Sequence, residues 1–274
     1  MRKYLIYFLL MIIVCGCLLA CSEPSSSFSI QFIDVGQGDA ALVECDGHHM
    51  LIDGGDTSAG DKVYNVLEEQ GIQHLDILAL SHRHDDHVGG LAKTLTYATS
   101  KITISNTTEG ETKAFKEFKR QLEINKSKLS IPHAGDKYKL GSAEVEVVDA
   151  SSQDNNDSLV LLVTYKKTKY LFTGDIGEKT QSRIADQYSN EADEPFKINL
   201  LKMPHHGGAA SIQFIRTFMP DYAIISVGKN QYDHPNSVTL ERIEQVDAKM
   251  FRTDKDGDIT VKSDGERITV KTSK

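Results

Sequence analysis

Three histidines and an aspartate lie within one short run of the chain, His82-x-His84-x-Asp86-His87. Imidazole nitrogens and carboxylate oxygens are ligands of borderline divalent ions such as Zn²⁺, Mn²⁺ and Fe²⁺. The apolar segment at residues 75–80 precedes the run and a pair of glycines follows it, so the histidines would lie where a buried strand ends. Loops in such positions commonly carry functional residues. The spacing predicts a metal site with one crowded ion or two neighbouring ions.

Five further motifs follow one another along the chain. They are IDVGQGDA at 33–40, LIDGG at 51–55, NNDSLVL at 155–161, LFTGD at 171–175 and LKMPHHG at 201–207. Together with the histidine run they resemble the metallo-β-lactamase superfamily, which contains hydrolases and a few oxidoreductases. The resemblance is to the branch represented by the extracytoplasmic hydrolase domain of ComEC-type competence proteins, and also to the teichoic-acid phosphorylcholine esterase module. It implies an α/β chain with a four-layer αββα fold over residues 28–274.

The resemblance also implies a set of ligands for two divalent ions, Zn²⁺ or Mn²⁺. His82 and His84 would bind the first ion, and Asp86 and His87 would bind the second. Asp175 would bridge the two ions, because the two oxygens of a carboxylate can face two cations.

The second half of the chain would complete the site. By the same resemblance His205 is expected to join the second ion, with His206 as a substitute ligand or a catalytic neighbour. Adjacent residues on an extended turn point in different directions, so both would not bind one ion. Asp86 or Asp175 would orient the nucleophile, and His206 or His234 would protonate a leaving group. For His234 a capping or surface role stays open.

The chain departs from the commonest superfamily pattern before the strand that leads to Asp175. A third histidine for the first ion is expected there, but residues 154–158 read DNNDS. An amide oxygen or water would complete the coordination, which weakens the preference for Zn²⁺. Asn156 would either contact a substrate phosphate or turn the chain.

Three aspartates in the first motifs have supporting roles. Asp53 is expected to accept a hydrogen bond from a ligating histidine and so to fix the orientation of the ring. Asp34 and Asp39 stand beside glycines that a tight turn requires. For this pair, a structural role and a place beside the metals are equally open.

The N-terminus is similar to a bacterial lipoprotein signal. Arg2 and Lys3 precede an apolar stretch at 4–19, which ends in LLAC with its cysteine at Cys21. Residues 1–20 would be removed, Cys21 would be lipidated, and residues 21–27 would form a flexible tether. The alternative is an uncleaved anchor, for which the stretch is short of the ~20 residues of a spanning helix. Either way the domain would lie on the extracytoplasmic face of a bacterial cell membrane.

Composition and charge limit the class of protein. A chain of 274 residues with 39% hydrophobic content can bury a sizeable core, and no charge block or low-complexity tract marks a second domain. The net charge of −8 argues against broad, nonspecific binding of polyanions. It does not exclude a phosphodiester substrate, because divalent ions would add positive charge at the site.

Expected strands and helices alternate along the chain, as in an α/β fold. Strands are expected at 29–35, 40–45, 49–52, 144–149, 158–164, 169–173, 196–202 and 222–226. Helices are expected at 62–70, 112–125, 179–188 and 237–245, and a hairpin around 263–265 would end the chain. The metal-site motifs fall where strands end, which places the chemistry at one edge of a sheet.

The chemistry that follows from such a site is hydrolysis. Divalent ions lower the pKa of a bound water, so that hydroxide exists near neutral pH, and they stabilise developing negative charge. We expect a phosphodiesterase that acts on DNA or on wall-polymer phosphorylcholine, ahead of lactams, thioesters and lactones. The alternative is a noncatalytic lipoprotein that captures a metal or a ligand and passes it to a membrane partner. Flavodiiron-like redox chemistry is disfavoured by the missing third histidine.

Overall fold

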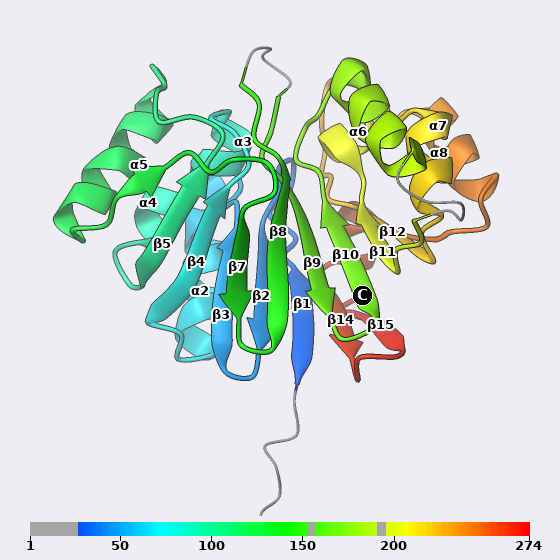
Figure 1. The fold of residues 1–274 in the computed structure, drawn as a ribbon. Helices are drawn as coiled ribbons and strands as arrows, with labels where there is room; N and C mark the ends of the chain where they lie inside the picture. Colours follow the sequence, from blue (N-terminus) through cyan, green and yellow to red (C-terminus); the bar gives the residue numbers. More distant parts are fainter. Residues whose placement is uncertain (1–26, 153–156, 191–195) are drawn as a thin grey trace, which may run out of the picture.

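The computed structural model describes residues 27–152, 157–190 and 196–274. Two β-sheets face each other, and helices cover the outer side of each sheet (Figure 1). The expected signal segment at 1–20, the tether up to residue 26 and Asn156 lie outside the described residues. Within the described ranges, no helix combines the length and the apolar character that crossing a membrane requires.

The first sheet joins strands from the beginning and the end of the described chain. Its strand order is β15-β14-β1-β2-β3-β4-β5-β6. In chain order the strands are β1 (Phe28–Phe32), β2 (Ala41–Cys45), β3 (His48–Ile52), β4 (His74–Leu80), β5 (Thr99–Ser105), β6 (Leu129–Ser130), β14 (Ile259–Ser263) and β15 (Ile268–Thr272). β3 to β6 run parallel to one another. The loops that follow β3, β4 and β5 therefore leave the sheet at the same edge.

The second sheet has the strand order β13-β12-β11-β10-β9-β8-β7. Its strands are β7 (Lys137–Leu140), β8 (Ala143–Asp149), β9 (Val160–Tyr165), β10 (Thr168–Phe172), β11 (Leu200–Lys202), β12 (Tyr222–Ile225) and β13 (Lys249–Arg252). β7 to β10 form antiparallel pairs, whereas β10 to β13 run parallel. The parallel part again brings several strand ends to one edge.

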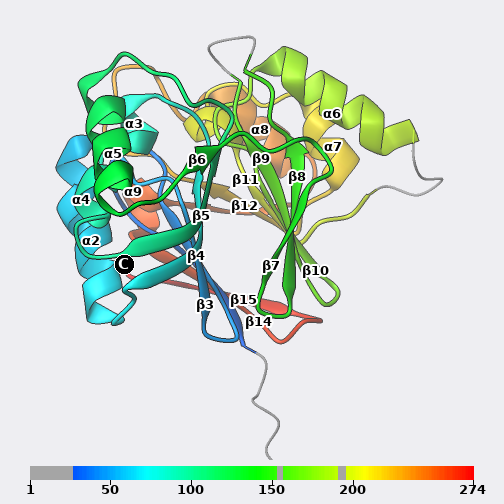
Figure 2. The same ribbon diagram turned by 60° about the vertical axis from the view of Figure 1, so that its left-hand side comes forward.

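Helices and sheets form four layers. Apolar side chains such as Ile30, Val43 and Val163 are fully buried between the two sheets. The first sheet is covered by α2 (Gly60–Glu69), α3 (Asp85–Val88), α4 (Leu91–Thr94) and α5 (Lys113–Ile124), and the second by α6 (Glu178–Asn190), α7 (Ile212–Phe218) and α8 (Ser237–Glu244). Figure 2 shows the two sets of helices on opposite sides of the paired sheets. This is the four-layer αββα fold that the sequence predicts.

Helix α5 illustrates how the local sequence forms these elements. Thr112 caps the helix, because its hydroxyl accepts a hydrogen bond from the backbone N–H of Phe115 at 3.2 Å. Phe115, Phe118 and Leu122 follow at helical spacing, and all three are buried in the core beneath the first sheet. The helix expected at 112–125 differs from α5 by one residue at each end.

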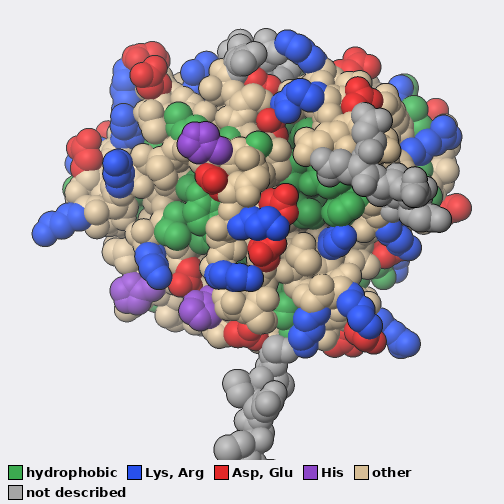
Figure 3. Space-filling model, in the orientation of Figure 1, with side chains coloured by type: hydrophobic (Ala, Val, Ile, Leu, Met, Phe, Trp, Pro, Cys, Tyr) green, Lys and Arg blue, Asp and Glu red, His purple; other side chains and the backbone are tan. Residues whose placement is uncertain are grey.

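Basic and acidic side chains are interspersed over the face of the molecule that Figure 3 shows. Charges of both signs in close mixture do not create the extended basic surface that polyanions bind nonspecifically.

Candidate metal centre

The histidine run and two later motifs meet at one end of the paired sheets. β4 leads into His82, β10 leads into Asp175, and β11 leads into His206. The first of these strands belongs to one sheet and the other two belong to the opposite sheet. The site is therefore built from both halves of the fold, at the carboxyl ends of strands, where ligands of open α/β sheets typically bind.

Two groups of potential metal ligands share one carboxylate. The first group is His82, His84 and Asp175, and the second group is Asp39, His87, Asp175 and His206. Within each group, one ligand atom from each residue lies within 4.8 Å of the others. A carboxylate common to both groups is the arrangement expected of a ligand between two cations.

Asp175 lies at the centre of the cluster. Its Oδ1 is 3.3 Å from Nε2 of His87. Its Oδ2 is 3.7 Å from Nε2 of His82 and 3.6 Å from Nε2 of His206. The backbone N–H of Asp175 donates to the hydroxyl of Ser158 at 2.9 Å, which holds the start of this loop. The side chain is buried, so the cluster has little access to bulk water.

Two of the converging atoms fit a bound cation. Nε2 of His87 and Oδ1 of Asp175 are buried and have no hydrogen-bond partner among the described residues. A buried polar atom without a partner costs about 1–3 kcal/mol. A cation between these atoms would satisfy both of them, and the mixture of imidazole and carboxylate suits a divalent transition metal. The buried His/Asp cluster is therefore consistent with metal binding.

Asp53 sets the orientation of His87. Its Oδ2 lies 2.9 Å from Nδ1 of His87, and its Oδ1 accepts from the backbone N–H of Ser81 at 2.7 Å. A proton on Nδ1 leaves Nε2 free as a ligand atom, and Nε2 is the atom that faces Asp175. The Ser81 hydroxyl lies 3.2 Å from the same Nδ1. Asp53 thus makes the contact expected of it from the sequence.

Asp86 lies on the solvent side of the cluster. Its side chain is 32% exposed, and its Oδ2 accepts a hydrogen bond from Nε2 of His206 at 3.1 Å. The distance to Nε2 of His87 is 3.9 Å. Burial would raise the pKa of Asp86, but the hydrogen bond from His206 and the charge on His87 lower it to about 2. Asp86 lies outside both ligand groups, so its role as ligand or as orienting group stays a prediction.

His206, rather than His205, lies among the buried potential ligands. His206 is 1% exposed, whereas the side chain of His205 is 38% exposed and its Nε2 is 3.8 Å from Asp175. Both histidines have left-handed backbones, with φ of 49° and 54°, which is unusual for residues with a Cβ and common at functional sites. Nδ1 of His206 donates to the carbonyl of Ser226 at 3.0 Å, which directs Nε2 toward Asp175. The geometry favours His206 over His205 for the second site.

Asp39 joins the second group, although the sequence left its role open. Its Oδ2 pairs with Nζ of the buried Lys202 at 2.7 Å, and its Oδ1 is 3.3 Å from Nδ1 of His206. Burial raises the pKa of Asp39, but the charges of Lys202 and His206 outweigh it and lower the pKa overall. Lys202 also donates to the carbonyl of Met203. Asp39 and Lys202 both lie within the motifs that resemble the superfamily. That placement was the sequence signal that could have pointed to their role.

The carboxylates of the cluster favour positive charge on the histidines beside them. Burial would lower the pKa of His87, but Asp175 and Asp53 raise it well above the ordinary value. Burial would also lower the pKa of His206, but Asp175 and its neighbouring aspartates raise it to about 10. For His82 burial prevails and the pKa falls. A divalent cation would meet the same negative field, and its binding would release protons from His87 and His206.

His234 lies beside the cluster without belonging to either ligand group. Its ring centroid is 4.9 Å from that of His205 and 6.4 Å from that of His206. Its backbone is held by Asn230, whose side chain accepts from the His234 N–H at 3.1 Å and donates to the His234 carbonyl at 2.8 Å. Burial lowers the pKa of His234. This position is compatible with contact to a leaving group, and the catalytic role stays a prediction.

Comparison with known proteins gives competence and recombination proteins as relatives. The chain is 29% identical to the ComE operon protein 3 of Bacillus subtilis over 261 residues, which are 86% of this chain and 33% of that protein. It is 26% identical to the competence protein ComA of Neisseria gonorrhoeae, covering 85% of this chain and 32% of that protein. The recombination protein 2 of Haemophilus influenzae is 26% identical, with 94% and 32% covered. The chain thus spans about a third of the length of these relatives.

Solved structures share the fold at low sequence identity. The metallo-beta-lactamase fold protein YhfI of Bacillus subtilis has a TM-score of 0.58 and 10% identity, covering 86% of this chain and all of that one. A diphosphatase from the PhnP family has a TM-score of 0.50 and 13% identity, covering 82% and 94%. The sequence model of the metallo-beta-lactamase superfamily matches residues 33–229. With the four-layer fold and the shared-carboxylate cluster, this match shows that the chain belongs to the metallo-beta-lactamase superfamily.

Proposed function

We propose that this protein is a metal-dependent phosphodiesterase. The observation that carries the proposal is the buried cluster in which Asp175 belongs to both groups of potential ligands. Two neighbouring divalent ions are the arrangement that many phosphatases and nucleases use to hold the attacking and the leaving oxygen of a phosphoryl group. A cluster of three buried ligands without a shared carboxylate would support a single ion and a wider range of reactions.

The residues have distinct tasks in this proposal. His82 and His84 would hold one Zn²⁺ or Mn²⁺ ion, His87 and His206 would hold the other, and Asp175 would be available to both. The ions would supply Lewis acidity and an activated water at neutral pH.

Groups around the ligands complete the proposed site. Asp86 is ionised and lies on the solvent side, where it can accept a proton from the attacking water or bind the second ion. His205 lies on the same side with 38% of its side chain exposed. It can contact a substrate oxygen, together with His234, whose ring lies 4.9 Å away.

The substrate class is argued from the site and from the relatives. The named relatives are competence and recombination proteins, which favours DNA over a wall-polymer phosphorylcholine. Only a third of their length is matched, so the activities of the whole proteins are not transferred to this chain. A lactam, thioester or lactone would use a similar nucleophile and stays an alternative for the assay.

Lipid anchoring is a separate part of the proposal. The motif that ends at Cys21 supports a lipid on that residue, and the described domain begins at residue 27, a few residues later. A short tether would hold the metal centre close to the membrane on the extracytoplasmic side. Metabolic labelling with a palmitate analogue would test it, with label expected on the wild type and none on Cys21→Ser.

The phosphodiesterase proposal is tested by hydrolysis with the soluble 22–274 chain. The substrates are bis(p-nitrophenyl) phosphate, p-nitrophenyl phosphorylcholine and single-stranded DNA, and the protein is stripped of metal and then given Mn²⁺ or Zn²⁺. Metal-restored hydrolysis of the phosphodiesters is expected, and it should be lost in Asp175→Ala. Stoichiometric metal binding without turnover of any ester would instead support the noncatalytic binding lipoprotein.

A further inference from the structure

A cavity adjoins the metal centre. Its volume is about 180 Å³, and its walls include His82, Arg83, Asn106, Thr107 and Glu109. His82 belongs both to this cavity and to the first group of potential ligands. A molecule bound at the metal centre can therefore extend into the cavity past the His82 ring.

Arg83 supplies a positive charge to this cavity. It stands between two histidines of the cluster and is exposed. Among the described residues, its guanidinium has no ion-pair or hydrogen-bond partner within the usual distances. A guanidinium presents a planar fork of donors that matches the oxygens of a phosphate, and it stays charged at any physiological pH. An arginine that has no partner in the described part of the chain, beside the metal centre, is well suited to hold a second anionic group of the substrate.

Asn106 and Thr107 line the same cavity, and hydrogen bonds hold both side chains. Asn106 is 3% exposed, and its Nδ2 donates to the carbonyls of Ser151 at 3.0 Å and Asp157 at 2.9 Å. Its Oδ1 is buried without a hydrogen-bond partner among the described residues. The Thr107 hydroxyl is engaged with the backbone of Glu109 in both directions. The hydrogen bonds of Asn106 and Thr107 therefore hold this part of the cavity wall in place.

We propose that this cavity, the Arg83 subsite, binds a phosphate that neighbours the scissile phosphodiester in the substrate chain. The inference rests on the proposed phosphodiesterase function. A polynucleotide carries such a neighbouring phosphate one sugar away from the scissile one. A phosphorylcholine ester carries a quaternary ammonium instead, which Arg83 would repel. The Arg83 subsite thus assigns the substrate to the class of polynucleotides.

Glu109 lines the same cavity as Arg83. It is exposed and contributes a negative charge to the wall. The other carboxylate of the cavity, Asp157, accepts a hydrogen bond from the hydroxyl of Thr180 at 3.0 Å. One of its oxygens therefore binds a side chain of helix α6. Removal of Arg83 and removal of Glu109 should therefore change the affinity for a neighbouring phosphate in opposite directions. This pair of opposite effects is specific to the Arg83 subsite.

The kinetic test compares two esters with the same leaving group. One is thymidine 3′-(p-nitrophenyl phosphate) with a free 5′-hydroxyl, and the other carries an additional 5′-phosphate. The measured quantity is the ratio of their kcat/KM values, so that any general loss of activity cancels. In the wild type the second phosphate should raise kcat/KM by about tenfold, as expected for a partly exposed charge-assisted contact. In Arg83→Gln the ratio should fall to about one, and in Glu109→Gln it should increase.

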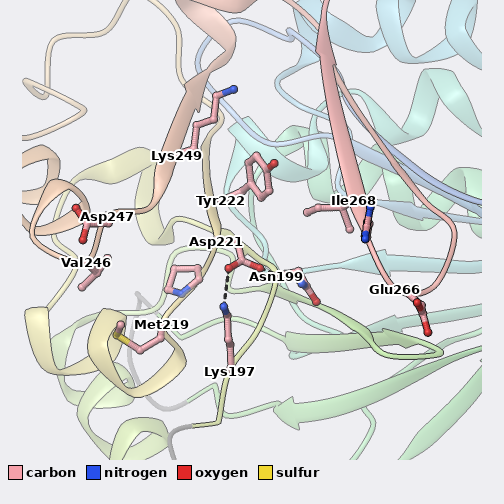
Figure 4. A pocket seen from close by; sticks show the side chains of 12 residues that line it. Lys197, Asn199, Met219, Asp221, Tyr222, Val246, Asp247, Lys249, Glu266 and Ile268 are labelled. Carbon is pink, nitrogen blue, oxygen red and sulfur yellow. Dashed lines mark hydrogen bonds and ion pairs between the residues drawn. The ribbon is translucent and has the colours of Figure 1, made fainter.

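Arg267→Gln is the matched control. Arg267 lines a separate cavity of about 870 Å³, shown in Figure 4, at the ends of β11 and β12 that are opposite to the metal centre. In that cavity Lys197 pairs with Asp221 at 2.8 Å, as the dashed line in Figure 4 marks. The substitution removes the same charge from the chain at a distant place. The ratio of the two kcat/KM values should stay at the wild-type value.

A binding measurement tests the Arg83 subsite without turnover. Thymidine 3′,5′-bisphosphate is titrated into the ¹⁵N-labelled, Zn²⁺-loaded protein, with thymidine 3′-phosphate as the reference. The bisphosphate should shift the Nε–H signal of Arg83 and the side-chain amide signal of Asn106, and it should bind about tenfold more tightly than the monophosphate. Equal affinities, with no shift of these signals, would overturn the assignment.

The outcomes separate the subsite from the function on which it rests. If the wild type hydrolyses neither the thymidine esters nor any phosphodiester of the panel described above, the proposed function fails, and the Arg83 subsite fails with it as a substrate subsite. If it hydrolyses the simpler ester but the second phosphate gives no gain, or if Arg83→Gln retains the gain, only the subsite is refuted. Faster hydrolysis of p-nitrophenyl phosphorylcholine than of the bisphosphate ester would also refute it.

Discussion

Asp53→Asn changes the tautomer of one ligand while it preserves the size of the side chain. Oδ1 of Asp53 accepts from the backbone N–H of Ser81 at 2.7 Å, and Oδ2 lies 2.9 Å from Nδ1 of His87. In asparagine the single oxygen must stay on the Ser81 N–H, so the amide nitrogen would face Nδ1 of His87. Two donors cannot share this contact. When His87 loses its second proton, the one that remains would then stay on Nε2, the atom that faces Asp175 and that a metal requires unprotonated.

The expected cost follows from that single contact. Metal binding to the variant must first return the proton to Nδ1, which leaves two buried donors facing each other at a cost of about 1–3 kcal/mol. Loss of such an orienting carboxylate typically weakens metal affinity by about tenfold to a hundredfold, which is about 1.4–2.7 kcal/mol. The two figures agree. The hydroxyl of Ser81, 3.2 Å from Nδ1 of His87, offers a poorer acceptor and sets the lower end of the range.

The assay is isothermal titration calorimetry of Zn²⁺ into the metal-stripped wild type and Asp53→Asn. Asp76→Asn is the control. Asp76 also pairs with a histidine, because its Oδ2 lies 3.1 Å from Nδ1 of His48. Asp76 lies near the start of β4, at the end of the sheet away from the cluster. We expect weaker binding in Asp53→Asn and unchanged binding in Asp76→Asn. Wild-type affinity in Asp53→Asn would refute the claim that Asp53 fixes the tautomer of His87.

Three further predictions concern the same cluster. His206→Ala should lose one of the bound ions and His205→Ala should keep both, as metal analysis after gel filtration would show; equal losses would contradict the preference for His206. Although burial opposes it, neighbouring carboxylates raise the pKa of His206 to about 10, so metal affinity should increase with pH up to about that value, by about tenfold per pH unit for each proton released. Calorimetry in buffers of different protonation enthalpy measures how many protons are released when the metal binds. A metal affinity that does not change with pH would contradict the raised pKa of His206. A Cβ at Gly38 would lie 2.3 Å from the carbonyl oxygen of Asp86, so Gly38→Ala should lower the free energy of unfolding in urea by about 1–3 kcal/mol; Gly36→Ala, with open space around its Cβ, should cost less, and equal costs would contradict the packing argument.

Ligands that are close in sequence could be predicted from the sequence. His82, His84 and His87 come from one stretch of six residues, so their types and spacing reveal a metal site before the fold is known. Apolar periodicity and caps also place the longer elements well, because these signals act within one helix or strand. The helix expected at 237–245 is found as Ser237–Glu244 in α8, where Asn236 caps the N-terminus.

Contacts between distant motifs could not be predicted in the same way. Asp39 meets Lys202 and His206 only because the two sheets pack face to face, and no local pattern encodes that approach. The choice between His205 and His206 depends on two successive left-handed backbones, which a sequence pattern with two adjacent histidines does not specify. The pairing of β14 with β1 in the first sheet likewise joins segments that are far apart in the sequence, so no local pattern predicts it.

The measurement that tests the central claim most directly is the number of metal ions bound by the wild type and by Asp175→Asn. Both proteins are dialysed against a metal buffer and analysed by mass spectrometry, with Asp221→Asn, a substitution in the distant cavity, as the control. The shared carboxylate predicts two ions in the wild type and in the control, and weakened binding of both ions in Asp175→Asn. Retention of two tightly bound ions by Asp175→Asn would contradict the account.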